Sequence, residues 1–199
     1  MSIAVLTALV GFAFVATVTP GPNNLMLMAS GANYGFRRTL PHMLGIVGGV
    51  TAMALLVGAG LMALFDAMPV LGTVLQVVSV IYLLWLAARI AMAAPVQQGE
   101  IDGRPMSFFQ ALAFQWVNPK AWAMCLTAVT LYAPDRSLVS VGIVAGAFAL
   151  VSFPAISVWA WLGTVLRQWL SNATRLRVFN VSMAALLVAS LYPVLRMHS

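Results

Sequence analysis

The chain has 199 residues, of which 62% are hydrophobic and only 7% are charged, and its mean hydropathy is +0.98. Soluble globular domains are about half apolar and about a quarter charged. This composition excludes a cytosolic globular protein, a disordered chain and a secreted domain held by disulfides. It predicts one compact unit whose solvent is the lipid bilayer.

Charge and cysteine content narrow the class further. The net charge is +6, from ten Lys and Arg against four Asp and Glu. In a soluble protein this excess would favour a nucleic-acid partner, but in a membrane protein basic residues in short loops orient the chain. We therefore expect no nucleic acid. Cys125 is the single cysteine, which excludes an internal disulfide and a Cys-pair metal site, and we expect neither a metal nor a cofactor.

Apolar stretches of about 20 residues or more are long enough to cross a membrane as helices. Six such stretches are present: 3–33, 40–65, 70–93, 107–131, 137–166 and 178–195. No basic residue precedes Arg37, whereas a signal peptide begins with a basic region. The first stretch is therefore predicted to be a retained helix, and the chain an all-α polytopic membrane protein with six transmembrane helices.

A polar connection divides the chain near its middle. Residues 95–106 hold Glu100, Asp102 and Arg104. We predict a loop here between two halves, about 1–94 and 107–199, of a single transmembrane transporter domain. The six apolar stretches leave no room for a second domain.

Arginines near the ends of the apolar stretches set the predicted orientation, because basic residues stay on the cytoplasmic side. Seven arginines lie on the side predicted to be cytoplasmic: Arg37, Arg38, Arg89, Arg104, Arg167, Arg175 and Arg177. Two lie on the other side, Arg136 and Arg196. With six spans, both termini are then predicted to be periplasmic.

Two of the six helices are predicted to be broken. The first stretch is too long for one straight helix across a hydrocarbon core of about 30 Å, and its middle reads Pro20-Gly21-Pro22 followed by Asn23 and Asn24. Prolines remove backbone donors and clash with preceding carbonyls. The fourth stretch carries a similar break, at Gln115-Trp116-Val117-Asn118-Pro119-Lys120.

The two breaks lie at matching positions of the two halves, about half the chain apart. The next stretch in each half has a Gly-xxx-Gly pattern, at Gly45 and Gly49 and at Gly142 and Gly146, with nearly the same offset. Such patterns allow close helix packing. With three helices per half, the second half must enter the membrane from the opposite side, so we predict a 3+3 inverted repeat.

Paired breaks in two inverted halves are typical of a transport site near the middle of the membrane. There the N-terminal ends of half-helices face anions and freed carbonyls face cations. The alternative is that the prolines only kink the helices, as we expect for Pro154. We predict substrate binding by the following residues: Pro20, Gly21, Pro22, Asn23, Asn24, Trp116, Asn118, Pro119 and Lys120.

Lys120 is the one charged residue deep within an apolar stretch. An ionised lysine at the bilayer centre costs about 2.5 to 3.5 kcal/mol, and no acidic residue lies within the stretches to pair with it. A substrate carboxylate would supply the missing charge, although the long stem could instead carry the ammonium to an interface. A substrate with an uncharged side chain fits this site. Proton coupling would need Lys120, His42, a hydrated backbone site or the substrate itself.

These motifs resemble the lysine exporter and homoserine–threonine resistance (LysE/RhtB) family over nearly the whole chain. The similar segments are Thr19-Pro20-Gly21-Pro22-Asn23-Asn24, Gly35-Phe36-Arg37, Gly45 with Gly49, residues 82–89 and Asn118-Pro119-Lys120. The resemblance implies a bacterial inner-membrane exporter of amino acids driven by the proton-motive force. Within the family, the chain looks most like the cysteine/O-acetylserine exporter branch. The second stretch lacks the acidic residue of lysine-exporting members.

The resulting hypothesis is a secondary transporter that exports neutral amino acids or their derivatives, of the cysteine/O-acetylserine or the threonine/homoserine type. Its partners would be a small amino acid and membrane lipid, and a homodimer is compatible with it. Two alternatives stay open: an exporter of another small solute such as a metal ion, and a passive channel. No serine-protease motif or redox cysteine pair is present, so an intramembrane enzyme is not expected.

Overall fold

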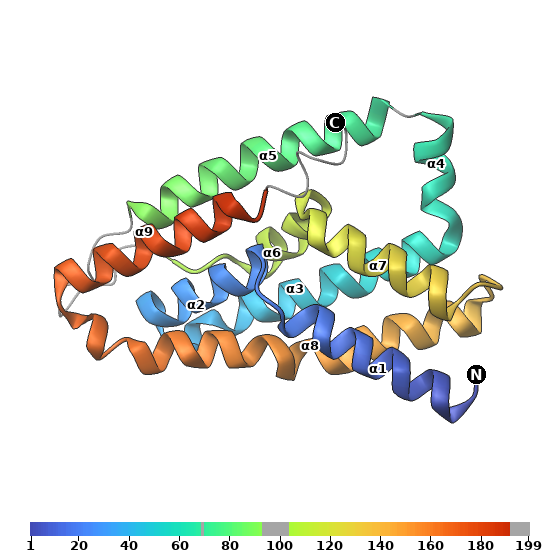
Figure 1. Ribbon diagram of the computed structural model, residues 1–199, viewed down its shortest axis with the longest axis horizontal. Helices are drawn as coiled ribbons and strands as arrows, with labels where there is room; N and C mark the ends of the chain where they lie inside the picture. Colours follow the sequence, from blue (N-terminus) through green and yellow to red (C-terminus); the bar gives the residue numbers. More distant parts are fainter. Residues whose placement is uncertain (69, 93–103, 192–199) are drawn as a thin grey trace.

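The computed structural model describes residues 1–68, 70–92 and 104–191, and all the regular structure in these ranges is helical (Figure 1). Most of the predicted central loop, with Glu100 and Asp102, lies outside the described residues, as does Arg196.

The helices follow the first five predicted apolar stretches closely, whereas the last helix begins at Ala173 and not at residue 178, and residues 192–195 lie outside the described residues. In chain order they are α1 (Ile3–Val18), α2 (Pro22–Tyr34), α3 (Phe36–Leu56), a π-helical turn (Val57–Leu61), α4 (Met62–Ala67), α5 (Val70–Ala91), α6 (Phe108–Phe114), a 3₁₀ turn (Gln115–Val117), α7 (Pro119–Tyr132), α8 (Leu138–Leu166), a second 3₁₀ turn (Trp169–Ser171) and α9 (Ala173–Ala189).

Three helical segments of the described chain are long and apolar enough to cross a membrane: Phe36–Leu61, Val70–Ala91 and Leu138–Leu166. The bent pair α1 and α2 would make a fourth span if it crosses as one unit. In the described ranges the protein is thus all-α, with the apolar helices of a multi-pass membrane protein, and three or four of the six predicted spans meet this criterion of length and composition.

Both predicted helix breaks are present. Helix α1 ends at Val18 and α2 begins with Pro22, and the two are bent by 57° relative to each other. In the second half, α6 ends in the 3₁₀ turn and α7 begins with Pro119, where the Asn118 side chain accepts a hydrogen bond from the Lys120 backbone N–H at 3.1 Å. Proline fits the first turn of a helix because the N–H it lacks has no partner there. By contrast, Pro154 lies inside the continuous α8.

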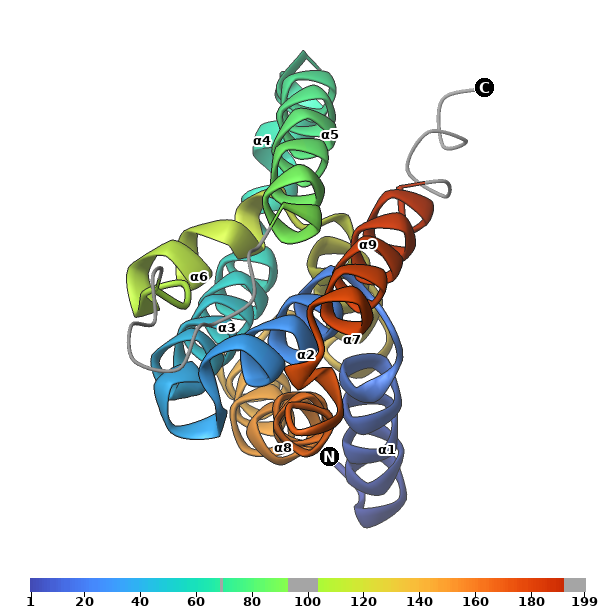
Figure 2. The ribbon, with the colours of Figure 1, turned by 90° about the vertical axis from the view of Figure 1, so that its left-hand side faces the viewer.

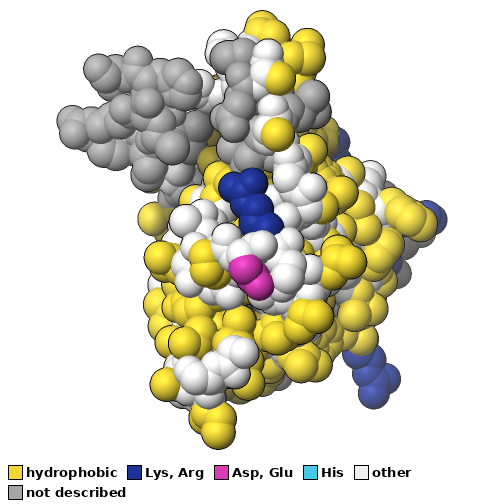
Figure 3. All heavy atoms as spheres, turned by 90° about the vertical axis from the view of Figure 1, so that its right-hand side faces the viewer, with side chains coloured by type: hydrophobic (Ala, Val, Ile, Leu, Met, Phe, Trp, Pro, Cys, Tyr) yellow, Lys and Arg dark blue, Asp and Glu magenta, His cyan; other side chains and the backbone are white. Residues whose placement is uncertain are grey.

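The helices of the two halves are intermixed. Helix α8 packs along α1, α2 and α3, and α3 packs on α6 and α7. Helices α5 and α9 contact each other, and α4 and α5 project away from α2, α3 and α8 (Figure 2). The end of the molecule at which α7 joins α8 is largely hydrophobic, with few charged side chains (Figure 3). The α2–α3 and α8–α9 junctions, which carry predicted cytoplasmic arginines, lie together at the opposite end (Figure 1).

Glycine allows close helix packing in the first half as predicted, but not at the predicted glycines of the second. A Cβ added to Gly45 or Gly49 would collide with the α6 backbone, at Phe108 and Leu112 respectively. A Cβ added to Gly142 or Gly146 would meet no heavy atom within 4 Å. Within the described residues, these two glycines therefore have no close neighbour, and close packing at them stays a prediction.

The close approach on α8 occurs elsewhere along the helix. A Cβ on Gly163 would collide with the Met28 carbonyl of α2, and a Cβ on Gly31 would collide with the Ala160 carbonyl of α8. Each helix thus presents its glycine to the backbone of the other. The tight contact of α8 is therefore with α2 near its C-terminal end, which explains why Gly142 and Gly146 have no close neighbour.

Candidate functional site

Lys120 joins the two helix breaks. Its ammonium nitrogen Nζ donates to the Thr19 carbonyl at 2.6 Å and to the Thr19 hydroxyl at 3.0 Å, and it lies 3.3 Å from the Pro20 carbonyl. Lys120 is in the first turn of α7, whereas Thr19 and Pro20 follow the last turn of α1. The C-terminal end of a helix carries a partial negative charge, so the ammonium is placed where that charge stabilises it.

The other carbonyls freed by the first break also have side-chain donors. The Asn24 amide Nδ2 donates to the carbonyls of Thr17 and Thr19, both at 2.7 Å. The indole Nε1 of Trp159, from α8, donates to the Val18 carbonyl at 2.9 Å. Backbone groups at membrane depth must find partners within the protein. Every carbonyl from Thr17 to Pro20 is therefore satisfied by a side chain.

An amide pair makes a second link between the breaks. The Asn23 Nδ2 donates to the Gln115 Oε1 at 2.8 Å, and the Gln115 Nε2 donates to the Asn23 Oδ1 at 3.1 Å. Gln115 is fully buried and also donates to the Ala111 carbonyl at 2.9 Å. The Asn118 Nδ2 lies 3.4 Å from the same Gln115 Oε1. One buried network thus includes an asparagine from each break.

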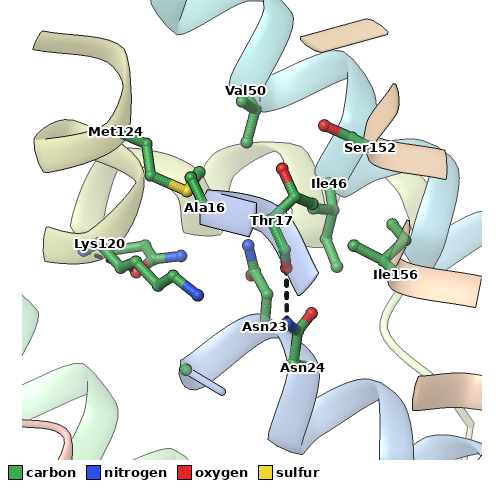
Figure 4. Close-up of a pocket in the computed structure, with 12 residues that line it drawn as sticks. Ala16, Thr17, Asn23, Asn24, Ile46, Val50, Lys120, Met124, Ser152 and Ile156 are labelled. Atoms are coloured by element: carbon green, nitrogen blue, oxygen red, sulfur yellow. Dashed lines mark hydrogen bonds between the residues drawn. The ribbon is translucent and has the colours of Figure 1, made fainter. Parts of the chain in front are cut away.

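A small cavity lies between the breaks, α3 and α8, with a volume of about 20 Å³. Its lining consists of Ala16, Thr17, Gly21, Asn23, Asn24, Ile46, Val50, Asn118, Lys120, Met124, Ser152 and Ile156. Figure 4 shows Lys120 extending toward Asn23, with Ile156 and Ser152 on the other side. This volume holds about one water molecule, so the site is too small for an amino acid in this conformation, and we call it the closed cavity in this sense.

Three polar atoms in the lining have no hydrogen-bond partner: the hydroxyl oxygens of Thr17 and Ser152 and the Asn24 Oδ1. All three residues are buried. A buried polar atom without a partner costs about 1–3 kcal/mol. The cavity therefore has unused hydrogen-bonding capacity, which a ligand or water can satisfy.

Gly21 makes room for Lys120. A Cβ added at Gly21 would lie 2.6 Å from Cδ and 3.2 Å from Nζ of Lys120. The lysine side chain thus crosses directly over a residue that has no side chain of its own. Of the other predicted residues, Asn23, Asn24 and Asn118 line the cavity.

The remaining predicted residues differ in their placement. Pro22 and Pro119 start α2 and α7, and Pro20 contributes its carbonyl to Lys120. Trp116 does not line this cavity, so its role in substrate binding stays a prediction. Its ring packs edge-on against Trp122, with centroids 5.8 Å apart, in an apolar pocket formed with α4 and α5. The 3₁₀ turn before Asn118 turns Trp116 away from the side on which Gln115 lies.

Sequence reasoning did not identify Thr17, Thr19, Gln115, Ser152 and Trp159 as site residues. Gln115 carried a signal, as an amide within the second break motif. Ser152 and Trp159 gave none, because they lie on a continuous helix and reach the site only through its crossing with α1 and α2. Within the described residues, no group of three or more His, Cys, Asp and Glu side chains could hold a metal ion.

Comparison with known proteins gives one family. Residues 14–190 match the family model described as LysE type translocator. The chain is 27% identical to the cysteine/O-acetylserine efflux protein of Escherichia coli strain K12, over 94% of this chain and 96% of the relative. It is 28% identical to the protein of the same name from Klebsiella pneumoniae, over 94% and 95% respectively. No solved structure matches the chain.

Proposed function

We propose that this chain, which belongs to the LysE type translocator family, is a secondary transporter. Its substrate would be a neutral amino acid or amino-acid derivative, exported from the cytoplasm. The observation that carries the proposal is the contact between Lys120 and the first helix break, beside a closed polar cavity. The names of the relatives favour cysteine or O-acetylserine as substrate, with threonine or homoserine as the second type.

The chemistry of the lining supports a zwitterionic substrate. The Lys120 ammonium is the one charged group in the cavity lining, and it would bind a substrate carboxylate. The unpartnered Asn24 Oδ1 can accept a hydrogen bond from the substrate ammonium, and the hydroxyls of Thr17 and Ser152 can donate or accept. A second positive charge on the substrate would meet no carboxylate in this lining.

The closed cavity requires a second conformation. Pockets for drug-sized ligands have volumes of about 300 Å³ or more, whereas this cavity has a volume of only about 20 Å³. A substrate carboxylate that binds Lys120 competes with the carbonyls of Thr19 and Pro20 for the same ammonium. Substrate binding would thereby loosen the contact between the two breaks, and this gives alternating access a physical trigger.

The helix contacts favour a 3+3 inverted repeat of two halves, about 1–94 and 107–199, within a single transporter domain. Helix α3 packs on α6 and α7 of the other half, and its proposed counterpart α8 packs on α1 and α2. The two remaining long helices, α5 and α9, contact each other. We further propose six spans in a bacterial inner membrane with both termini periplasmic. A homodimer is compatible with this arrangement.

Transport in proteoliposomes tests the function. The purified chain is reconstituted, and efflux of radiolabelled cysteine, O-acetylserine, threonine and homoserine is measured against lysine as a cationic control. We expect saturable, gradient-driven flux of at least one neutral amino acid and none of lysine. Flux that does not saturate would indicate a channel, and flux of divalent cations alone would indicate a metal exporter. Either result contradicts the proposal.

A further inference from the structure

A second, larger cavity lies beyond the first along α2 and α3, with a volume of about 240 Å³. Residues of α2, α3, α5 and α6 line it, together with the segment 104–106. It is about twelve times the volume of the closed cavity at the helix breaks. Unlike that cavity, it has room for a molecule of amino-acid size.

The two cavities follow each other along the same two helices. On α2, Asn24 lines the first cavity and Ser30 and Asn33 line the second. On α3, Ile46 lines the first and His42 lines the second. Four residues of helix correspond to about 6 Å, so His42 lies one helical turn from the closed cavity.

His42 has an unused hydrogen-bonding capacity in this second cavity. Its side chain is 1% exposed, and neither ring nitrogen has a hydrogen-bond partner. Buried polar groups nearly always have a partner, either in the protein or in an ordered ligand or water. An imidazole that lines a roomy cavity without a partner is thus a position at which a ligand can bind.

Two arginines give the cavity a positive charge. Arg89 lies in the last turn of α5, with its guanidinium carbon 5.8 Å from the Trp85 ring centroid, and Arg104 precedes α6. No Asp or Glu is among the described residues that line the cavity. The planar guanidinium group matches the two oxygens of a carboxylate. Both arginines also belong to the set that predicts the cytoplasmic side.

We infer that this second cavity is a loading site, in which Arg89 and Arg104 bind the carboxylate of a zwitterionic amino acid and His42 contacts it on the side nearer the helix breaks. The inference rests on the proposed export function and deepens it. An exporter must collect its substrate from the cytoplasm, and the larger cavity would hold the amino acid before Lys120 receives its carboxylate. The same chemical group would then pass from one cationic site to the next.

Transport kinetics test the arginines. Efflux of O-acetylserine and of threonine is measured for the Arg89→Gln/Arg104→Gln variant and for the control Arg38→Gln, an exposed arginine on α3 that does not line the cavity. We expect the double variant to raise KM about tenfold or more, because the loss of a charge-assisted hydrogen bond weakens binding by about that factor. Its maximal rate should stay close to that of the wild type. The control should keep the wild-type KM. An unchanged KM in the double variant would overturn the inference.

A His42→Phe variant separates binding from packing. Phenylalanine keeps an aromatic ring and removes two unpartnered buried nitrogens, so a purely structural role predicts an equal or higher melting temperature with KM unchanged. A ligand contact predicts a raised KM in a protein that is at least as stable. A raised KM supports the loading site, and an unchanged KM contradicts the role of His42.

Labelling of an introduced thiol locates the ligand directly. Gln110 lines the cavity, whereas the neighbouring Phe109 is 77% exposed and does not. Gln110→Cys and Phe109→Cys are made in a Cys125→Ala background and labelled with a maleimide, with and without O-acetylserine or its methyl ester. We expect the free acid alone to slow labelling at position 110, and neither compound to slow it at position 109.

The outcomes distinguish this inference from the function it rests on. If the wild type transports no amino acid and no compound protects position 110, both fail. If it transports O-acetylserine or threonine but position 110 is labelled equally fast with the free acid and with the ester, the loading site alone is wrong. Protection by the free acid in a protein that transports nothing would support the site and contradict the export function.

Discussion

Gly21 lies directly beneath the Lys120 side chain, and a Cβ at this position would come within 2.6 Å of the lysine Cδ. The backbone at Gly21 is extended, with φ at 176°, which any residue can adopt. The need for glycine here therefore arises from Lys120 and not from the backbone. Two residues about a hundred positions apart, one from each break, thus share the same small space.

Gly21→Ala is expected to retain the fold and lose transport. The atoms in its way belong to a flexible side chain, so Lys120 can move aside, but its ammonium then leaves the carbonyls of Thr19 and Pro20. The matched control is Gly11→Ala on α1, where an added Cβ meets nothing within 4 Å and the helix gains up to about 1 kcal/mol. Efflux rate and thermal unfolding in detergent check both variants. Wild-type efflux from Gly21→Ala would contradict the role assigned to Lys120.

Lys120→Gln is expected to weaken carboxylate binding about tenfold or more, because a charge-assisted hydrogen bond is lost. The variant should remain folded, since Asn24 still donates to the Thr19 carbonyl. Binding of the transported amino acid is compared with that of its amide, which has no carboxylate. The wild type should prefer the acid and Lys120→Gln should not. An equal preference in both proteins would remove the carboxylate from this site.

The amide pair between the breaks can be measured by a double-mutant cycle. Gln115→Met and Asn23→Leu each leave a partly or fully buried amide without its partner, at a cost of about 1–3 kcal/mol in unfolding free energy. The double variant should cost less than the sum of the two, because residues that share hydrogen bonds are coupled. Thermal unfolding of the four proteins gives the coupling. Simple additivity would show that the pair contributes no stability.

The glycines of α8 give a contrast within one helix. Gly163→Ala forces a methyl group against the α2 backbone at Met28, which cannot move aside as a side chain can, and overpacking typically costs about 1–3 kcal/mol. Gly146→Ala places its methyl group in open space and should gain up to about 1 kcal/mol from helix propensity. The melting temperatures of both variants and of the wild type, measured under the same conditions, test this contrast. A destabilised Gly146→Ala would indicate a neighbour at that face.

Two tryptophans should differ in their effect on transport. Trp159→Phe removes the donor to the Val18 carbonyl at the first break, so we expect slower efflux and a lower melting temperature. Trp116→Phe keeps an aromatic ring in an apolar pocket outside the site, so KM for the substrate should stay at its wild-type value. A large KM change in Trp116→Phe would instead support a role of Trp116 in substrate binding.

The positions of the helix breaks could be predicted from sequence because proline acts locally. A Pro-Gly-Pro run and an Asn-Pro pair end one helix and start the next whatever surrounds them. The partners of the freed carbonyls could not be predicted in the same way. Trp159 reaches Val18 only because α8 crosses α1 there, and this crossing is set by tertiary packing.

The second Gly-xxx-Gly pattern also shows that a local sequence pattern does not predict tertiary contacts. Gly45 with Gly49 and Gly142 with Gly146 are equivalent as sequence patterns, but among the described residues only the first pair meets a neighbouring helix. A small residue permits close packing and does not cause it, so the pattern gives no partner. Trp116 is a similar case, because a one-residue difference in a 3₁₀ turn decides whether Gln115 or Trp116 faces the site.

The close contacts that Gly31 and Gly163 make between α2 and α8 have a consequence for the proposed transport cycle. Where two backbones touch, neither helix can slide or rotate along the other without a collision, so α2 and α8 must move as one rigid body. Shear between packed helices requires room for side chains to repack, and these two glycines leave none. We therefore expect the displacements that open either side to occur in elements that pack against this unit without such glycine contacts: α1, α7 and α5.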